Sequence, residues 1–267
     1  MPSAKNPANR MVVKSNELIQ KSRFSLSLQQ QRIVLFLISL ISEGDQEFRE
    51  YQFTISDFLK LCGMQMNNGQ NYQYVKDALQ ALSNKSMWLE IDGVDTLVRW
   101  LESPKINRTT HQISVRLDRA LMPYLLQLKQ NFTQYELRWT LKFDSKYSNR
   151  LYELLKSVYY NSLEPYSYTF DLALLRQQID AAKYKTWQDF KARALEPAIA
   201  EINKFSDLNV TYEAKKTGRA VTKIKFTMET KDALTRIRMS CEGETTETEL
   251  LPDEQKPSET MDGFEPI

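Results

Sequence analysis

The sequence is poor in the residues that build metal sites, cofactor sites and disulfide frameworks. Its 267 residues include two cysteines, one histidine and seven glycines. Cys62 and Cys241 lie far apart in the chain and match no metal-ligand or disulfide spacing. The longest apolar run, Ile33 to Ile41, is too short to span a bilayer. We therefore expect a reduced, cytoplasmic protein that has no membrane segment and uses no cofactor.

The same shortages exclude common catalytic arrangements. His111 is the only histidine, so the chain cannot build a catalytic triad or the histidine pair that holds a metal beside a nicking tyrosine. Tyr159 and Tyr160 could suggest such a nicking enzyme, but they share an apolar helix face with Leu151 and Leu155, which favours core packing. No Gly-rich phosphate loop of the Walker type is present. We predict that the chain is not an enzyme.

Charge is distributed unevenly along the chain. The net charge is +2, but residues 241–267 carry nine acidic residues and one lysine, which leaves residues 1–240 at +10. A basic body favours a polyanionic partner such as nucleic acid, although many soluble domains carry a similar excess. We expect residues 1–12 and the acidic tail, residues 231–267, to be disordered. We assign the tail no role beyond solvation.

The hydrophobic pattern predicts the same order of elements twice. In the first half it predicts helices over 25–42, 54–63 and 72–82, then strands over 87–91, 97–101 and 112–117. In the second half it predicts helices over 143–160, 170–179 and 187–205, then a β-hairpin over 208–228. Each half therefore consists of three helices followed by a hairpin.

An offset of 115 residues aligns the two halves. Tyr51-x-Phe53-Thr54 then matches Tyr166-x-Tyr168-Thr169, and residues 72–76 match residues 187–191. Because the element order agrees as well, we interpret the halves as copies of one fold. Three helices with a two-stranded wing are typical of the winged helix, a helix-turn-helix variant. The predicted class is α+β, with two tandem winged-helix domains related by internal duplication over residues 13–125 and 126–230.

The third helix of each copy has a polar face suited to DNA. In the second copy the inner face is formed by Trp187, Phe190, Ala194, Ala198 and Ile202, and the outer positions are Lys185, Gln188, Lys191 and Arg193. In the first copy the outer positions are Gln73, Tyr74, Lys76 and Gln80. Amides and cations on a helix can contact base edges in the major groove. An ordinary solvated helix face is the alternative. We expect Pro197 to kink the second-copy helix and to restrict base contacts to the part before it.

The hairpin over 208–228 has a basic tip. Lys215, Lys216 and Arg219 surround Gly218 in the predicted turn. Hairpin tips are often polar only because they contact water. Beside a basic helix, however, we favour a tip that binds phosphate. The counterpart in the first copy is the turn that carries Lys105 and Arg108.

Separated segments of the chain resemble the iteron-binding plasmid replication initiators of the theta type. Residues 14–19 read Lys-Ser-Asn-Glu-Leu-Ile ahead of a helix with Gln31-Arg32-Ile33, and residues 187–203 keep Phe190-Lys191-x-Arg193. The resemblance spans residues 11–230. It implies tandem winged-helix domains that bind repeated origin sequences (iterons) in double-stranded DNA. It also implies that monomers start replication, that dimers repress the initiator's own gene, and that the host replication initiator and the replicative helicase are partners.

Two other functions fit the same pattern. A winged-helix transcriptional repressor without a replication role would use the same surface, whereas a protein–protein scaffold would leave the basic tips unexplained. Direct repeats beside an A·T-rich stretch near the gene would favour the initiator, and a lone inverted repeat would favour the repressor. The apolar strands over 87–91 and 97–101, with Trp88 and Trp100, are predicted to form a dimer interface. An ordinary sheet packed on its own helices is the alternative.

Overall fold

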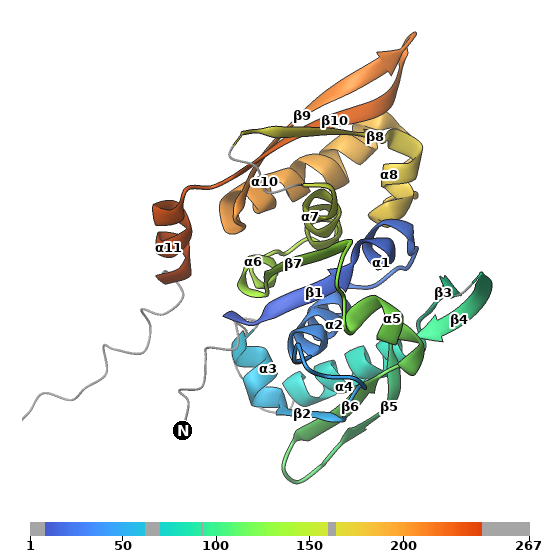
Figure 1. The fold of residues 1–267 in the computed structure, drawn as a ribbon, viewed down its shortest axis with the longest axis vertical. Coiled ribbons are helices and arrows are strands. Elements are labelled where there is room, and N and C mark those ends of the chain that lie inside the picture. Colours follow the sequence, from blue (N-terminus) through green and yellow to red (C-terminus); the bar gives the residue numbers. More distant parts are fainter. Residues whose placement is uncertain (1–8, 62–69, 92, 160–163, 242–267) are drawn as a thin grey trace, which may run out of the picture. The chain divides into compact units, whose positions relative to one another are not determined.

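The computed structural model describes residues 9–61, 70–91, 93–159 and 164–241. The chain divides into two units, residues 1–231 and residues 232–267. The first half contains, in order, β1 (Met11–Ser15), α1 (Asn16–Lys21), α2 (Leu28–Ser39), β2 (Tyr51–Thr54), α3 (Ile55–Leu61), α4 (Gln70–Ser83), β3 (Ser86–Ile91), β4 (Val94–Arg99), β5 (Leu101–Ile106), β6 (Gln112–Leu117) and α5 (Met122–Leu125) (Figure 1). The second half of the chain contains β7 (Phe132–Glu136), α6 (Arg138–Leu141), α7 (Lys146–Val158), β8 (Tyr166–Asp171), α8 (Leu172–Gln178), α9 (Trp187–Phe190), α10 (Glu196–Phe205), β9 (Leu208–Thr217), β10 (Ala220–Thr230) and α11 (Ala233–Cys241).

The first winged-helix domain contains a three-stranded antiparallel sheet in the order β2–β6–β5. Ser27 and Gln30 form a capping box that starts α2, the predicted apolar helix. Phe36 of α2 packs edge-on against Phe53 of β2, with ring centroids 4.9 Å apart, and against Phe58 of α3 at 6.0 Å. This aromatic cluster joins the sheet to the helices, and α4 buries its predicted apolar face against them.

The second winged-helix domain repeats this sheet in the order β8–β10–β9. Phe170 of β8 packs against Phe226 of β10 with ring centroids 5.8 Å apart, and α8 and α10 pack on the same three strands. The first strands of the two sheets begin at Tyr51 and Tyr166, the pair that the predicted offset aligns. The shared strand order confirms the prediction of two winged helices.

A separate hairpin, β3–β4, distinguishes the first domain from the second. Its strands pair from Ser86↔Arg99 to Ile91↔Val94. The strand predicted over 97–101 is wrong in its bounds, because β4 ends at Arg99 and β5 begins at Leu101. Trp100 lies between them, 1% exposed, with its ring edge-on to Phe24 at 5.0 Å. The chain therefore changes from one sheet to another at a buried tryptophan.

The segment before the first winged helix pairs with a strand that follows it. β1 and β7 form a two-stranded antiparallel sheet that runs from Met11↔Glu136 to Ser15↔Phe132. α7 packs against α1, α2 and β7, and it also packs against α10 of the second domain. The β1–β7 pairing joins residues from both sides of the domain boundary predicted at 125/126. The position of that boundary stays a prediction.

Two segments that were expected to be disordered contain regular secondary structure. Met11 and Val12 belong to β1, because they pair with β7 and Val12 is fully buried. Residues 233–241 form α11, where Asp232 accepts hydrogen bonds from the backbone amide and the hydroxyl of Thr235 at 2.9 and 2.6 Å. The expectation of disorder was wrong for these residues. No helix in the described ranges combines the length and apolar character that a membrane span requires.

Tyr159, considered as a nicking nucleophile, lies in the core. It is 8% exposed, and its hydroxyl accepts hydrogen bonds from the backbone amide and the side chain of Thr230, both at 3.1 Å. This contact fastens the end of α7 to the end of β10. Tyr160 lies outside the described residues.

Candidate nucleic-acid interface

The third helix of the second domain starts at a well-defined cap. Thr186 is the N-cap residue: its hydroxyl oxygen accepts the Asp189 backbone amide at 3.0 Å and donates to the Asp189 carboxylate at 2.8 Å. Its carbonyl accepts the Phe190 amide at 3.2 Å, the first hydrogen bond of the helix. These bonds satisfy donors that a helix start otherwise leaves unpaired. The direction of α9 is therefore fixed at its first turn.

A π-helical turn, Lys191–Leu195, separates α9 from α10. Pro197 lacks an amide hydrogen, and its ring would clash with the carbonyl four residues earlier in a regular helix. The backbone widens before it, and the Glu196 amide bonds to the Lys191 carbonyl five residues back. The irregularity expected near Pro197 therefore lies in the turn that precedes it, and the helix continues to Phe205.

The predicted outer positions of this helix differ in exposure. Lys185, Gln188 and Arg193 are exposed, whereas Lys191 is half-buried. The Arg193 guanidinium lies 3.6 Å from Asp189, and the Lys191 ammonium lies 3.3 Å from Glu196. Exposed ion pairs of this kind contribute only about 0.2–1 kcal/mol. Both cations can therefore exchange their carboxylate partners for a stronger anion at little cost.

The wing is the hairpin β9–β10, which continues past the end of β8 (Figure 1). Gly218 and Arg219 form its two-residue turn, and Gly218 takes the positive φ of 62° that such a turn requires at its first position. Lys216 and Arg219 are exposed and have no recorded ion pair within the described ranges. Lys215 binds its neighbour Glu213 at 2.6 Å. Three predicted basic residues therefore meet at the tip, two of them unpaired.

Lys215 also pairs across the hairpin with Lys223, next to a β-bulge. Like charges directly opposite one another destabilise a hairpin, and a bound anion would remove that repulsion. Lys223 is exposed, and Lys225 lies two residues further along β10. Neither residue was predicted as a site residue. Their alternation with buried Ile224 and Phe226 was the signal that could have identified them.

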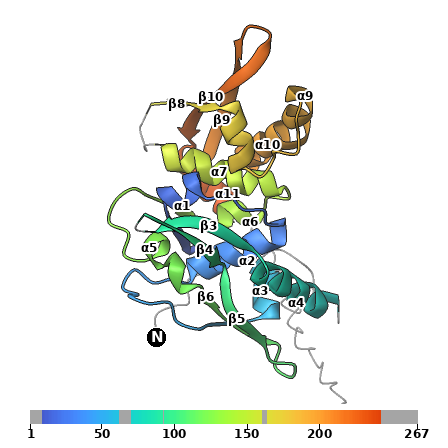
Figure 2. The ribbon, with the colours of Figure 1, turned by 90° about the vertical axis from the view of Figure 1, so that its right-hand side faces the viewer.

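The wing is connected to the third helix. The Tyr212 hydroxyl of β9 donates to the Glu196 carboxylate of α10 at 3.3 Å. Burial raises the pKa of Tyr212 to about 12, and Glu196 adds to the shift. Asn203 of α10 exchanges two hydrogen bonds with the Val210 backbone, at 2.9 and 2.6 Å. These hydrogen bonds join the hairpin to α10, and Figure 2 shows both elements from a second direction.

The first domain carries its predicted residues on α4. Gln73, Lys76 and Gln80 are exposed and Tyr74 is half-buried. The Gln73 side-chain amide donates to Asp77 at 2.6 Å, which shows that this face also holds an acidic residue. The outer face of α4 is therefore less cationic than the corresponding face of the third helix in the second domain.

The wing of the first domain is the β5–β6 hairpin. Lys105 binds Glu50 at 2.9 Å and Arg108 is exposed in the connecting turn. His111, with a positive φ of 55°, places its ring 5.4 Å from the Tyr72 ring of α4. The turn and the start of α4 are thus in contact.

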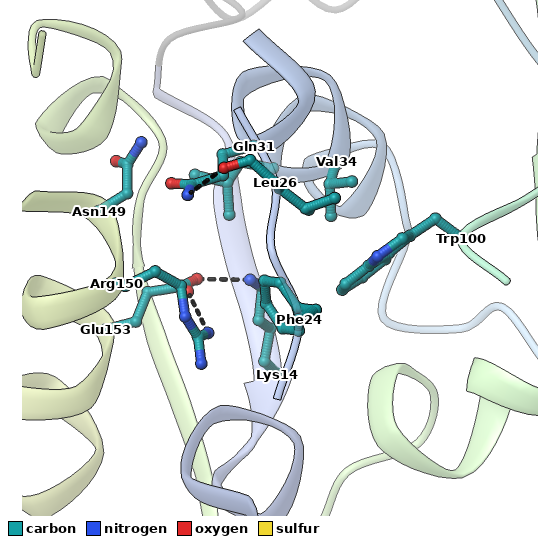
Figure 3. Close-up of a pocket in the computed structure, with 10 residues that line it drawn as sticks. Lys14, Phe24, Leu26, Gln31, Val34, Trp100, Asn149, Arg150 and Glu153 are labelled. Atoms are coloured by element: carbon teal, nitrogen blue, oxygen red, sulfur yellow. Dashed lines mark hydrogen bonds and ion pairs between the residues drawn. The ribbon is translucent and has the colours of Figure 1, made fainter. Parts of the chain in front are cut away.

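A small cavity lies where β1, α2 and α7 meet (Figure 3). Its volume is about 10 Å³, roughly the space of a single water molecule. Figure 3 shows Glu153 of α7 bonded to both Lys14 and Arg150. Burial lowers the pKa of Lys14, although Glu153 opposes the shift. The cavity is too small for an organic ligand, and its ion cluster fastens β1 to α7.

No cluster of three or more histidine, cysteine, aspartate or glutamate side chains that could hold a metal occurs in the part of the chain that the structure describes. The described candidate residues are instead amides, cations and one tyrosine. These groups suit hydrogen bonding to bases and phosphates.

Two helix-turn-helix units, each with a three-stranded sheet and a wing, define a tandem winged-helix protein. The model of the family described as "Initiator Replication protein, WH1" matches residues 11–156, and that described as "Initiator Rep protein, WH2" matches residues 174–228. The chain belongs to this family of replication initiators.

Relatives from Escherichia coli agree with this assignment. A "Replication initiation protein" is 23% identical over 230 residues, which cover 82% of this chain and 69% of that protein. A "PI protein" is 30% identical over 129 residues, which cover 43% of this chain and 42% of that protein. The latter match therefore spans less than half of the relative.

A solved structure shares the fold. It is described as "Crystal structure of Pi initiator protein in complex with iteron DNA" and superposes with a TM-score of 0.71 at 20% identity, covering 84% of this chain and 99% of that chain. The arrangement of both winged-helix domains is thus found in a known initiator.

Proposed function

We propose that the chain binds iterons, the direct repeats of a plasmid origin, in double-stranded DNA and thereby starts replication. The observation that carries this proposal is the wing of the second domain. Lys216, Arg219 and Lys223 present three exposed cations with no recorded ion pair within the described ranges, beside a helix whose outer face holds Gln188 and Arg193. The solved structure with a similar fold is that of an initiator bound to iteron DNA.

The second domain reads sequence through its third helix. The major groove admits an α-helix, and each base pair presents a distinct donor and acceptor pattern there. Arg193 offers a two-donor fork to guanine, and the Gln188 amide suits adenine. Arg193 must leave Asp189 to do so, which costs little because the side chains are 67% and 47% exposed.

The wing provides affinity without reading sequence. Its cations contact phosphates beside the groove that the helix occupies, and phosphate contacts position a protein on the duplex. The repulsion between Lys215 and Lys223 is offset in part by Glu213, 2.6 Å from Lys215, and it is relieved further when a phosphate lies between the two lysines. This relief lowers the energy of the wing when it is bound to DNA relative to the free wing, and it therefore favours binding.

The first domain contributes a second contact of lower charge. Gln73, Lys76 and Gln80 of α4 enter a neighbouring major groove, and Arg108 of the β5–β6 turn reaches the backbone beside it. Because Lys105 is held by Glu50, this domain adds less electrostatic attraction than the second one. It contributes mainly to sequence selection.

Initiation by this chain requires binding rather than catalysis. A protein with no catalytic role can start replication by holding origin DNA and recruiting the host replication initiator and the replicative helicase. We include these two host proteins in the proposal as partners.

Self-association uses the outward face of the β3–β4 hairpin. Trp88 and Leu97 are opposite one another on this face and are 64% and 55% exposed, and Val94 is 63% exposed. Trp100, which was predicted to share the surface, is buried and cannot contribute. An exposed tryptophan–leucine pair suits the centre of a self-complementary interface. The dimer formed there represses the initiator's own gene.

The test is binding of the full chain to duplex DNA across a salt series. The probe is a duplex that the wild-type protein selects from a randomised pool. For about six phosphate contacts, affinity should fall roughly a thousandfold between 50 and 200 mM salt. Replacing Lys216 and Arg219 by alanine should weaken selected and scrambled duplexes alike and flatten the salt slope by about one unit per lost contact.

The matched control removes two exposed cations outside both helix-turn-helix units. Lys129→Ala with Lys142→Ala makes the same change in net charge, and it should leave the slope close to the wild-type value. A salt-insensitive wild-type affinity, or equal effects of the two double variants, would contradict the proposed role of the wing.

A further inference from the structure

Arg176, in the last turn of α8, bonds to the residues that start the recognition helix. Its guanidinium donates one hydrogen bond to the Lys185 carbonyl at 3.1 Å and another to the Thr186 carbonyl at 3.0 Å. The same guanidinium lies 5.2 Å from the centre of the Phe190 ring. One side chain therefore contacts the residue before the cap, the cap itself and the first buried aromatic of the helix.

These contacts hold the part of the helix from which the reading side chains extend. The Thr186 carbonyl also accepts the Phe190 amide, so Arg176 joins the first hydrogen bond of the helix. Phe190 is fully buried, so protein encloses its ring on every side. Gln188 and Arg193 follow Thr186 by two and seven residues, within about 10 Å along the helix axis. A shift at the cap would therefore displace both reading side chains together.

The two terminal nitrogens of Arg176 each bind one carbonyl. Its Nε atom is enclosed by protein, where DNA cannot reach it, and it has no hydrogen-bond partner among the described residues. Burial also lowers the pKa of the guanidinium. A planar fork bound to two adjacent carbonyls has a geometry that a lysine ammonium cannot reproduce.

We propose that Arg176 is a positioning residue for sequence reading, which aligns the recognition helix through the Lys185 and Thr186 carbonyls and does not itself bind phosphate. The inference rests on the proposed binding of double-stranded DNA. It assigns specificity to a residue outside the predicted set, on the helix that precedes the reading helix.

The test compares Arg176→Met, which keeps the length of the side chain, with Arg176→Lys, which keeps its charge. Each full-length variant is titrated with the duplex selected by the wild-type protein and with a scrambled duplex of the same composition. Both variants should lose about tenfold to a hundredfold of the preference for the selected duplex. Affinity for the scrambled duplex and its salt slope should stay at the wild-type values, because no phosphate contact is removed.

Lys183→Met is the matched control, since Lys183 is an exposed cation in the connection between α8 and α9, with its ammonium 5.0 Å from the Tyr184 ring centre. It should retain the wild-type preference. If Arg176→Met weakened both duplexes equally and Arg176→Lys restored both, Arg176 would be a phosphate contact and the inference would be wrong. Full preference in both Arg176 variants would also overturn it.

Thermal unfolding of each variant is measured alongside the titrations. If both variants lost the fold, Arg176 would be a residue needed for folding and the assignment would be overturned. If only Arg176→Met unfolded, the duplex preference of Arg176→Lys would decide whether Arg176 positions the recognition helix. If the wild-type chain itself showed no preference between the duplexes, the proposed function would fail instead, so the two failures are distinguishable.

Discussion

Replacement of Glu153 by glutamine removes the negative charge of the buried cluster on α7 while keeping the shape of the side chain. Glu153 accepts hydrogen bonds from Lys14 and Tyr135, both at 2.5 Å, and lies 3.4 Å from Arg150. The Lys14 and Glu153 side chains are 4% and 3% exposed, so bulk water does not screen their charges. The variant therefore leaves the Lys14 ammonium and the Arg150 guanidinium buried without a counter-charge.

We expect Glu153→Gln to lower the free energy of unfolding by about 3–5 kcal/mol at neutral pH, the usual effect of removing one partner of a buried ion pair. Urea denaturation followed by circular dichroism measures the loss. Lys14→Met combined with Glu153→Gln is the matched control. An uncharged pair of similar size is often as stable as a buried ion pair. The double variant should therefore recover the part of the loss that comes from Lys14, whereas Arg150 keeps only its hydrogen bonds to the Gln178 and Ile19 carbonyls.

The pH dependence gives a second test of the same cluster. Burial alone would raise the pKa of Glu153, but Lys14 and Arg150 hold that pKa below its ordinary value of 4.5. Such a carboxyl stabilises the fold fully above its unfolded-state pKa and loses this effect as the pH falls through the folded-state pKa. The difference between wild type and Glu153→Gln should be constant above about pH 5 and shrink below about pH 4. The reasoning would be refuted if Glu153→Gln lowered the free energy of unfolding by less than about 1 kcal/mol, or if its effect were the same in acid as at neutral pH.

Three further variants test other parts of the account. Arg193→Ala should weaken the binding free energy for the selected duplex by about 1–3 kcal/mol and relax the sequence preference at one position of the site. An equal loss of affinity for the selected and the scrambled duplex would show that another element reads the DNA. Trp88→Ser with Leu97→Ser should abolish the concentration-dependent dimer in sedimentation without weakening DNA binding, because the proposed dimerisation competes with iteron binding. A wild-type protein that stays monomeric at high concentration would remove the proposed interface. Trp100→Ala should lower stability by about 3–5 kcal/mol in urea denaturation, and an effect below about 1 kcal/mol would contradict its place in the core.

The spacing of apolar residues in the sequence predicted the helices and strands that bury one face in the core. Val75, Leu79 and Leu82 recur at helical spacing in α4, and Ile224, Phe226 and Met228 alternate in β10, because burial repeats with the period of each structure. The cap at Thr186 was predictable as well, since the capping side chain and the amide that it binds are only three residues apart. These features depend on neighbours in sequence.

Features that depend on distant partners were not predictable. Lys14 is buried because Glu153, 139 residues away, supplies its counter-charge. Met11 and Val12 form a strand because β7 offers the edge. The β3–β4 hairpin and the sheet that starts at Leu101 look like one set of strands in sequence, and only the buried Trp100 separates them. The role of Arg176 likewise depends on where a side chain from one helix meets the start of the next.

Hydroxyl-radical footprinting of the full chain on the selected duplex tests most directly whether both winged helices bind one DNA molecule. The account predicts two protected regions on one face of the duplex, about one helical turn (10–10.5 base pairs) apart. Replacing Gln73, Lys76 and Gln80 of α4 by alanine should remove one of them, and Arg193→Ala should weaken the other. A single protected region that the α4 variant leaves unchanged would contradict the account, because the first domain would then take no part in binding DNA.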